Sequence, residues 1–414
     1  MKTHCLIPGI FLALAGAALA QTSATTAPNP QTAVVPPAWG PASPYPQDQA
    51  GAFQEPVAGG PGSAPLFQWG PVGLSPEATY ELLYTDGILA GPGRPASTTL
   101  QSFSPGVLFQ LGTNWTLEYV PTWEVYSNPL FHDTVDHSVR LDGKAVYEDW
   151  TVRLSQTYLR SSDPLVEPGR QTPQQIYATA LRSTYGYGAR TLLELGLDQN
   201  IRLSSAAPDF YEWSTQDWLH FLISPRVDTA IGPGAGYVRV DPGVDMSYFR
   251  PEARLTWQAA DKLSLDLQGG VESRKFINSA SGNLTSSVYS ATADYRLTDT
   301  TDLTAQADRD VEIAYAPNQI TEVGRYTAGL RQRLLQHFYL GASAGWQKSD
   351  YIAIGGVRTD VRHDRAGTYQ LSLSTFLLRH LNASLQYSHI RNDSDIPGFG
   401  IASNQYGLVL GYKY

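Results

Sequence analysis

The stretch that decides the fold is Gln405-Tyr-Gly-Leu-Val-Leu-Gly-Tyr-Lys-Tyr414. Its aromatic and leucine side chains recur at every second residue, and smaller or more polar residues stand between them. Period-two alternation predicts a β-strand with one apolar and one more polar face. The closing strand of an outer-membrane barrel has this form, because it must pair with the first strand and seat an aromatic ring at the bilayer interface. We therefore expect an all-β transmembrane barrel.

The same alternation continues through the chain from about residue 76. Apolar side chains recur at every second residue in segments that begin at Trp115, Leu263, Tyr289, Tyr369 and Leu381. Short links, rich in turn-forming residues, fall at 112–114, 142–144, 186–188, 225–226, 259–261, 298–300, 336–337 and 380–381. Longer loops fall near 86–97, 127–131, 160–173, 203–211, 240–246, 277–285, 312–320, 351–364 and 391–402.

This order of links predicts the topology. Short and long connections alternate along the chain, which predicts roughly 16 to 18 antiparallel strands with both ends on the periplasmic side. A soluble β-sandwich array or propeller would instead show a fixed repeat length and strands of about five or six residues. The alternation therefore favours a barrel over residues 71–414.

The composition fits a protein surface that meets lipid. Charged residues make up 16% of the 414 residues, and there are 24 Tyr and 9 Trp. Soluble domains carry roughly 25% charged residues. Outside the N-terminal region no run of about 18 apolar residues exists, so only a closed barrel could satisfy the backbone in lipid. The formal net charge of -9 argues against a nucleic-acid partner.

The first 20 residues have the features of a signal peptide. Lys2 supplies the positive charge, residues 6–17 the apolar run, and Ala18-Leu-Ala20 the cleavage site. The alternative, a membrane-anchoring helix, would need a longer apolar run. The single cysteine, Cys5, lies within this segment, so we expect a mature chain without disulfides or thiolate metal sites.

Residues 21–70 are rich in Pro, Ala and Gly. Proline lacks an amide donor and the small side chains bury little surface, so we expect a disordered periplasmic segment. An arm that binds a partner or contacts peptidoglycan is the alternative.

Charged residues occupy many positions opposite the apolar rows, and we expect these to line the pore. Their alternative role is to form ion-paired ladders that brace the wall. The predicted pore-lining residues are Glu118, Glu124, Arg140, Arg153, Asp266, Glu272, Arg274, Asp294, Arg296, Asp308, Arg331 and Arg333. On the lipid face each charge would cost about 2–4 kcal/mol near mid-membrane.

Aromatic residues near strand ends are expected to form the two interfacial girdles. A carbohydrate-stacking surface inside the lumen is the alternative. The predicted girdle residues are Trp115, Tyr126, Trp150, Tyr158, Trp213, Trp218, Trp257, Tyr295, Trp346 and Tyr412.

No catalytic residues are expected. An outer-membrane hydrolase could use Ser388 and His389 with Asp393 or Asp395. Asp393 and Asp395, however, lie among turn-forming residues, where local hydrogen bonding explains them.

No cofactor or metal site is expected either. The histidines lack metal-ligand spacing, and acidic loop residues such as Asp360 and Asp364 are too sparse for a calcium loop. The glycines of 232–236 are followed by no helical pattern, so they predict a kink or relief of crowding in a strand rather than a phosphate site.

Three stretches resemble the outer-membrane barrels called putative β-barrel porins. They are Trp257-Gln-Ala-Ala-Asp-Lys-Leu-Ser-Leu-Asp-Leu-Gln-Gly-Gly-Val-Glu-Ser-Arg274, then Tyr295-Arg-Leu-Thr-Asp-Thr-Thr-Asp-Leu303 with Ala307-Asp-Arg309, and the ending from Tyr406 to Tyr414. The resemblance covers roughly residues 70–414. It implies a barrel without catalytic residues, and the association of such barrels with exopolysaccharide or capsule export implies a polysaccharide conduit. Asp308-Arg-Asp310 is more charged than the family pattern, which leaves the lumen lining open there.

We therefore expect a porin-like barrel in the outer membrane of a Gram-negative-type bacterium. Its expected partners are lipid, the barrel-assembly machinery through the C-terminal strand, and hydrophilic solutes or a polysaccharide chain that diffuses passively through a charged lumen. The alternative is a structural or adhesive barrel whose pore is blocked by loops. Loops 160–173 and 351–364 are the candidates to fold inward, because they are the longest.

Overall fold

The computed structural model describes residues 65–335, 337–355 and 362–414, all of which fall in the compact unit Trp39–Tyr414. The signal peptide predicted over 1–20, and the Pro-rich segment up to residue 64, lie outside the described residues. Within the described ranges, no helix is long and apolar enough to cross a membrane.

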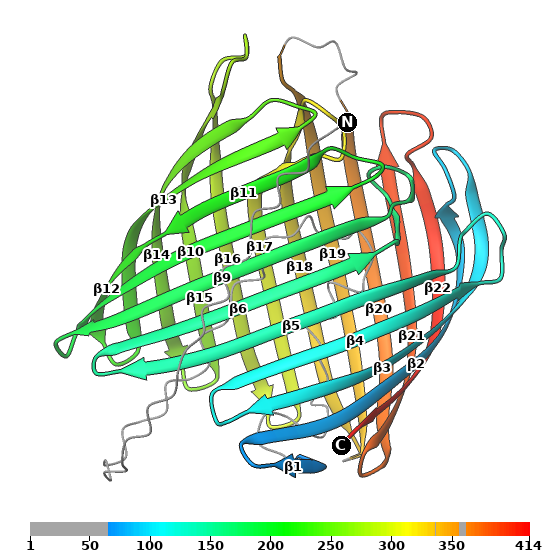
Figure 1. Ribbon diagram of the computed structural model, residues 1–414, viewed down its shortest axis with the longest axis horizontal. Coiled ribbons are helices and arrows are strands. Elements are labelled where there is room, and N and C mark those ends of the chain that lie inside the picture. The colour runs from blue at the N-terminus through cyan, green and yellow to red at the C-terminus, as the bar shows by residue number, and fades with distance from the viewer. Residues whose placement is uncertain (1–64, 336, 356–361) are drawn as a thin grey trace. The chain divides into compact units, whose positions relative to one another are not determined.

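The described chain is all β, and its strands wrap into a barrel (Figure 1). The strands are β1 (Phe67–Trp69), β2 (Val72–Leu89), β3 (Pro95–Leu111), β4 (Trp115–Tyr126), β5 (Thr134–Tyr147), β6 (Trp150–Ser161), β7 (Pro164–Leu165), β8 (Arg170–Gln171), β9 (Gln174–Tyr187), β10 (Thr191–Ser204), β11 (Asp209–Gln216), β12 (Trp218–Ser224), β13 (Val227–Asp241), β14 (Met246–Ala260), β15 (Leu263–Phe276), β16 (Leu284–Thr298), β17 (Thr301–Ile313), β18 (Gln319–Leu334), β19 (Phe338–Ala353), β20 (His363–Leu378), β21 (Leu381–Ser394) and β22 (Ile401–Lys413).

The barrel wall has 18 antiparallel strands, within the predicted range. β11 and β12 both pair with β10 and β13 and form one interrupted strand of the wall. β7 and β8 form a separate two-stranded hairpin. β1 pairs only with the start of β2, from Phe67↔Leu74 to Trp69↔Val72. The last residues of the segment predicted to be disordered, up to residue 70, therefore contain a short strand.

The prediction that the last strand closes the barrel is confirmed. β22 pairs with β2 from Glu77↔Lys413 to Thr85↔Gln405, and with β21 on its other side. Lys413 Nζ lies 3.2 Å from Glu77 Oε2, so an ion pair supplements the ladder at the seam. Among the 18 described strands of the wall, each strand is paired on both sides, which is the condition for a sheet in lipid.

Seven of the eight predicted short links fall at junctions between consecutive strands of the wall, and the prediction at 142–144 is wrong. The link predicted at 142–144 lies inside β5, and the turn comes at 148–149, where Glu148 adopts a φ of 51°. Asp142-Gly143 is a strong turn signal in sequence. Here Gly143 instead makes room for a neighbouring ring, because a Cβ at this position would lie within about 2.0 Å of Trp115.

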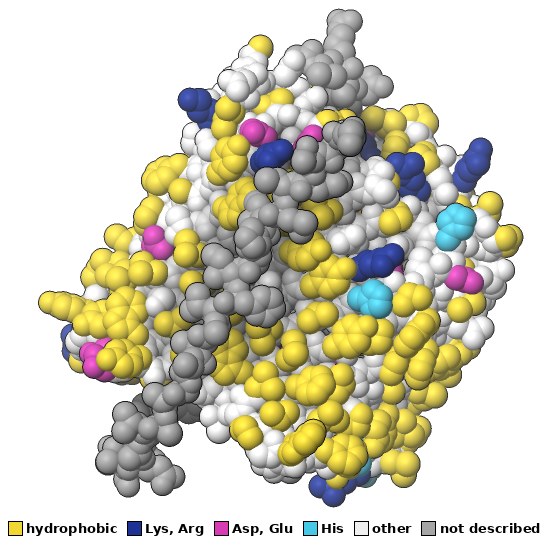
Figure 2. Space-filling model, viewed as in Figure 1, with side chains coloured by type: hydrophobic (Ala, Val, Ile, Leu, Met, Phe, Trp, Pro, Cys, Tyr) yellow, Lys and Arg dark blue, Asp and Glu magenta, His cyan; other side chains and the backbone are white. Residues whose placement is uncertain are grey.

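The outer face of the wall is apolar. Hydrophobic side chains spread over much of the face seen in Figure 2, with few charged side chains among them. Paired leucines of neighbouring strands belong to this surface, including Leu82, Leu385 and Leu408. Two predicted girdle residues are exceptions. Tyr126 and Trp218 alternate with exposed apolar residues and are buried. An aromatic residue near a strand end does not by itself tell which face of the strand it occupies.

Candidate functional site

Each wall strand carries two rows of side chains that face opposite sides of the sheet. On β15, Leu267 and Val271 are exposed, whereas Glu272 and Arg274 in the alternate row are 1% and 2% exposed. Because the sheet closes on itself, the alternate row lines the interior. All twelve predicted pore-lining residues lie in this inner row, as the strand register shows. Whether solutes pass along them stays a prediction.

One inner cluster is a dense ion-pair network on β14, β15 and β17. Arg250 lies 2.5 Å from Glu272 and 2.6 Å from Asp310, and Arg274 lies 2.7 Å from Glu272. Arg274 also donates to the carbonyl oxygen of Val311 at 3.1 Å. Two arginines and two carboxylates thus neutralise each other and bind three strands of the wall together. Sequence reasoning found Glu272 and Arg274 but missed Arg250 and Asp310, although both alternate with outward-facing residues.

The second inner cluster packs rings over a row of glycines on β13. Gly232, Gly234 and Gly236 occupy the inner row of β13. This agrees with the prediction that small residues relieve crowding in this strand. A Cβ on Gly236 would lie 2.3 Å from the ring of Tyr248, and one on Gly232 would lie 3.1 Å from the ring of Trp218. The glycines at 232 and 236 therefore leave room for the neighbouring aromatic rings beside the β13 backbone. Tyr248 also donates to Glu212 Oε1 at 2.8 Å.

The remaining predicted residues are spread around the inner wall, and most contact a partner of their own. Arg140 pairs with Asp142 at 2.6 Å, Arg296 with Asp302 at 3.9 Å, and Asp308 with Arg325 at 3.1 Å. Thr256 donates to Asp266 at 2.6 Å, and Arg331 lies over the ring of Tyr339 at 5.4 Å. Across the ladder, Glu118 stands opposite Arg140, Arg153 opposite Lys144, Asp294 opposite Thr304, and Arg333 opposite Tyr339.

A loop between β6 and β9, residues 162–173, enters the interior; we call it the lumen loop. It contains the β7–β8 hairpin, and its Leu165 and Val166 are 2% and 6% exposed. Val166 packs against Ile390 and Ile401, which lie in the inner rows of β21 and β22. The lumen loop starts at the end of β6. Round the barrel from β6, the strands β5, β4, β3 and β2 come before β22 and β21. The lumen loop therefore reaches across the interior, as expected for one of the two longest loops.

Polar contacts also fix the lumen loop to the β17–β18 loop. The backbone N–H of Tyr315, in the β17–β18 loop, donates to Glu167 Oε1 at 2.5 Å, and the Tyr315 hydroxyl donates to Gln174 Oε1 at 3.1 Å. Burial raises the pKa of the Glu167 carboxyl to about 7, against the opposing effects of the Tyr315 N–H and of Arg202 and Arg362. Sequence reasoning singled out neither Glu167 nor Tyr315.

Two arginines brace these contacts from inside aromatic sandwiches. Arg202 is fully buried, with its guanidinium 4.7 Å from the ring centre of Phe210 and 3.9 Å from that of Tyr315. Arg362 lies 4.0 Å from the ring centre of Phe399 and donates to the carbonyl oxygen of Glu167 at 2.8 Å. A desolvated cation–π contact of this kind contributes about 2 kcal/mol.

The second predicted inward loop, 351–364, is only partly described, and Asp360 lies outside the described residues. Arg362 in this loop pairs with Asp364 at 2.5 Å, so Asp364 serves an ion pair. Ser388 and His389 face opposite sides of β21, where Ser388 donates to Gln405 and His389 contacts Asn404. The two side chains therefore do not form the nucleophile–base pair that a hydrolase would need.

Comparison with known proteins supports the barrel assignment. Residues 248–414, from within β14 to the C-terminus, match the family described as Putative beta-barrel porin 2. No curated protein matches the sequence.

Similar solved structures come from Pseudomonas aeruginosa. OccK11 (OpdR) is 13% identical with a TM-score of 0.41, over 82% of this chain and 95% of that chain. OccK9 (OpdG) is 13% identical with a TM-score of 0.48, over 82% and 98%. OccK2 (OpdF), solved in complex with glucuronate, is 10% identical with a TM-score of 0.47, over 82% and 98%. The chain forms a closed antiparallel β-barrel, and its residues 248–414 match the family described as Putative beta-barrel porin 2.

Proposed function

We propose that the barrel passes small hydrophilic solutes by passive diffusion, through an interior narrowed by the lumen loop. A barrel of this strand number encloses an aqueous channel rather than a packed core. The inner rows of this wall carry the charged residues, and the outer rows carry the apolar ones. The observation that carries the proposal is the crossing of the lumen loop, because it places Val166 against Ile390 and Ile401 inside the barrel.

The same observation favours small solutes over the polysaccharide chain that the resemblance implies. The lumen loop is attached at both ends to the wall, and it contacts the β17–β18 loop through Glu167 and Tyr315. A polymer strand would have to share the lumen with this loop or displace it. Small solutes would need only the space beside it.

The charges of the wall would bias passage without any chemical step. Ion pairs such as Arg182–Asp198, at 2.8 Å, place opposite charges on neighbouring strands, so the field runs along the wall surface. Such pairs orient polar solutes and select by charge. We therefore infer that the pore selects only modestly among solutes by their charge.

Solute uptake into proteoliposomes tests the proposal. Liposomes that hold the purified full-length protein should swell rapidly in monosaccharides and amino acids, and progressively more slowly in di-, tri- and tetrasaccharides. Equal rates for all sizes would contradict a narrowed lumen.

A structural barrel with a blocked pore is the second candidate, and the lumen loop favours it too. If the loop closes the interior completely, correctly folded protein will give no swelling with any solute. Heat-modifiable migration in gels would show that such silent protein is folded.

A further inference from the structure

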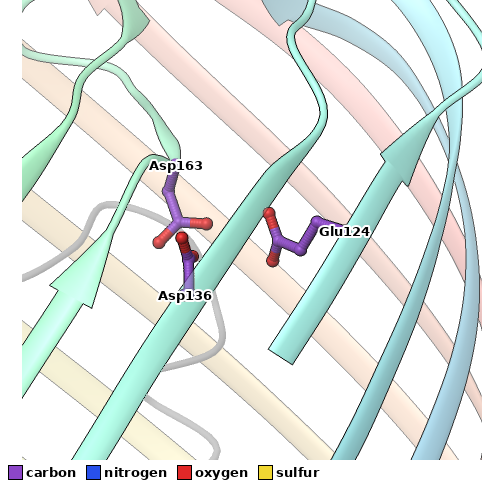
Figure 3. Close-up of side chains that lie close together, drawn as sticks. All are labelled: Glu124, Asp136 and Asp163. Atoms are coloured by element: carbon purple, nitrogen blue, oxygen red, sulfur yellow. The ribbon is translucent and has the colours of Figure 1, made fainter. Parts of the chain in front are cut away.

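Three carboxylates from separate segments meet at the base of the lumen loop. Glu124 comes from β4, Asp136 from β5 and Asp163 from the start of the lumen loop, and their side chains converge (Figure 3). One ligand oxygen from each residue lies within 4.8 Å of the other two. Oxygens that share one Ca²⁺ at about 2.4 Å can be up to about 4.8 Å apart. The spacing therefore suits one shared ion.

A second observation points to a ligand here. Asp136 is 8% exposed, and its Oδ1 atom has no hydrogen-bond partner in the described part of the chain. Glu124 is 6% exposed, and its Oε2 accepts hydrogen bonds from the Tyr126 hydroxyl at 3.1 Å and from Thr134 Oγ1 at 3.2 Å. A buried acceptor that lacks a partner costs free energy unless something else satisfies it.

The two buried carboxylates of the cluster, Glu124 and Asp136, are not held in direct salt bridges by the residues that the structure describes. Among the described residues, no salt bridge joins a Lys or Arg side chain to Glu124 or Asp136. Elsewhere on the inner wall, buried carboxylates such as Glu272 are paired with arginine. A cation bound beside Glu124 and Asp136 would therefore supply a positive charge that no Lys or Arg side chain of the described residues brings into direct contact with them.

The ligand chemistry identifies the class of ion. All three donors are carboxylate oxygens, which prefer hard cations. Two donors stand on wall strands and one on a loop, so the three do not belong to one rigid element. Mg²⁺ demands near-octahedral geometry, whereas Ca²⁺ accepts irregular cages.

We propose that Glu124, Asp136 and Asp163 bind Ca²⁺ and that the ion fastens the lumen loop to β4 and β5. The other end of the loop is already held, because Gln171 Nε2 donates to the His132 carbonyl and Gln171 Oε1 accepts from the His132 N–H, both at 2.9 Å. With Ca²⁺ bound, both ends are fixed. Without it, repulsion among the three carboxylates weakens the attachment of Asp163 to β4 and β5. The effect on passage rests on the proposed function, whereas ion binding does not.

Terbium luminescence tests the binding directly. Tb³⁺ substitutes for Ca²⁺, and a nearby tyrosine sensitises its emission; here Tyr126 donates a hydrogen bond to the ligand Glu124. Full-length protein in lipopolysaccharide-free detergent should give saturable Tb³⁺ emission. Ca²⁺ should displace Tb³⁺ with a Kd on the order of 10⁻⁴ to 10⁻³ M, as for extracellular modules, and Mg²⁺ should displace it less well.

Three variants make the result specific. Asp163→Asn, on the loop, leaves the wall unchanged, and Asp136→Asn removes the buried donor; each should weaken Ca²⁺ binding about tenfold or more. Asp142→Asn is the matched control, because this inner-row carboxylate pairs with Arg140 outside the cluster, and it should bind as the wild type does. Absence of saturable emission from wild-type protein, or equal binding by Asp163→Asn, would overturn the proposal. Either result would leave the solute-passage proposal standing, since that is tested by swelling.

Discussion

The backbone N–H of Tyr315 donates to Oε1 of Glu167 at 2.5 Å, and this hydrogen bond joins the lumen loop to the β17–β18 loop on the other side of the barrel. The two residues are 148 positions apart in the sequence. The contact is one of those that keep the lumen loop inside the barrel. Conditions that change the ionisation of Glu167 should therefore change the conductance of the pore.

Acidic pH should stabilise the docked loop. Burial raises the pKa of Glu167 to about 7 in the docked state, despite Tyr315, Arg202 and Arg362, and Glu312 raises it further. When the loop is undocked and Glu167 is solvated, its pKa is the ordinary value near 4.5. Between about pH 4.5 and 7, docking is therefore accompanied by proton uptake, and the docked state becomes less stable as pH rises through that window. We expect higher or noisier conductance at about pH 8 than at about pH 5.5.

The control for this prediction is Glu167→Gln. The amide cannot ionise, so the pH dependence in this window should disappear while the channel remains. A pH response that survives unchanged in this variant would show that another group causes it.

Loss of Arg250 should destabilise the wall. Its removal leaves Glu272 and Asp310, whose side chains are 0% and 5% exposed, without their shared cation. Breaking a buried ion pair in this way costs about 3–5 kcal/mol. Arg250→Met should therefore unfold at clearly lower urea concentration in reversible folding experiments with lipid vesicles.

The matched control also removes the carboxylate that Arg250→Met leaves without a cation. In the double variant Arg250→Met/Asp310→Asn, Glu272 keeps Arg274 as its partner, and much of the stability should return. If Arg250→Met alone unfolds as the wild type does, the network does not stabilise the barrel.

A methyl group at Gly236 should disturb the ring that lies over it. A Cβ there would lie 2.3 Å from Tyr248, so Gly236→Ala must displace the ring and its hydrogen bond to Glu212. Overpacking of this kind costs about 1–3 kcal/mol. Gly186→Ala is the control, since nothing lies within 4 Å of that position in β9. Equal urea midpoints for the two variants would contradict the packing described here.

The sequence predicts the wall well because its signals are local. Alternation at period two marks strands wherever one face is apolar, and the pairing of β22 with β2 follows from closure. Errors arose where a local signal was ambiguous. Asp142-Gly143 has the chemistry of a turn but lies within β5, and Trp218 has the chemistry of a girdle residue but faces inward.

The interior is harder to predict because its contacts join distant residues. Loop length marked 160–173 as able to fold inward, but the packing of Val166 against Ile390 and Ile401 depends on more than 200 intervening residues. Arg250 could have been found, since it alternates with Phe249 and Leu255 at period two. Pro251 within that strand obscured the pattern. The meeting of Glu124 and Asp136 with Asp163 has no signal in sequence, because a loop brings the third carboxylate to the wall.

The most direct test of the account is the single-channel conductance of a barrel without the β7–β8 hairpin. The N–H of Thr172 donates to the carbonyl of Asp163 at 3.0 Å, so residues 164–171 can be replaced by Asn-Gly as a tight turn. Replacing residues 279–282, in the loop between β15 and β16, in the same way is the control. We predict stable channels for the wild type, a conductance about twofold or more higher without the hairpin, and no change in the control. Equal conductance with and without the hairpin would contradict the claim that the lumen loop narrows the pore.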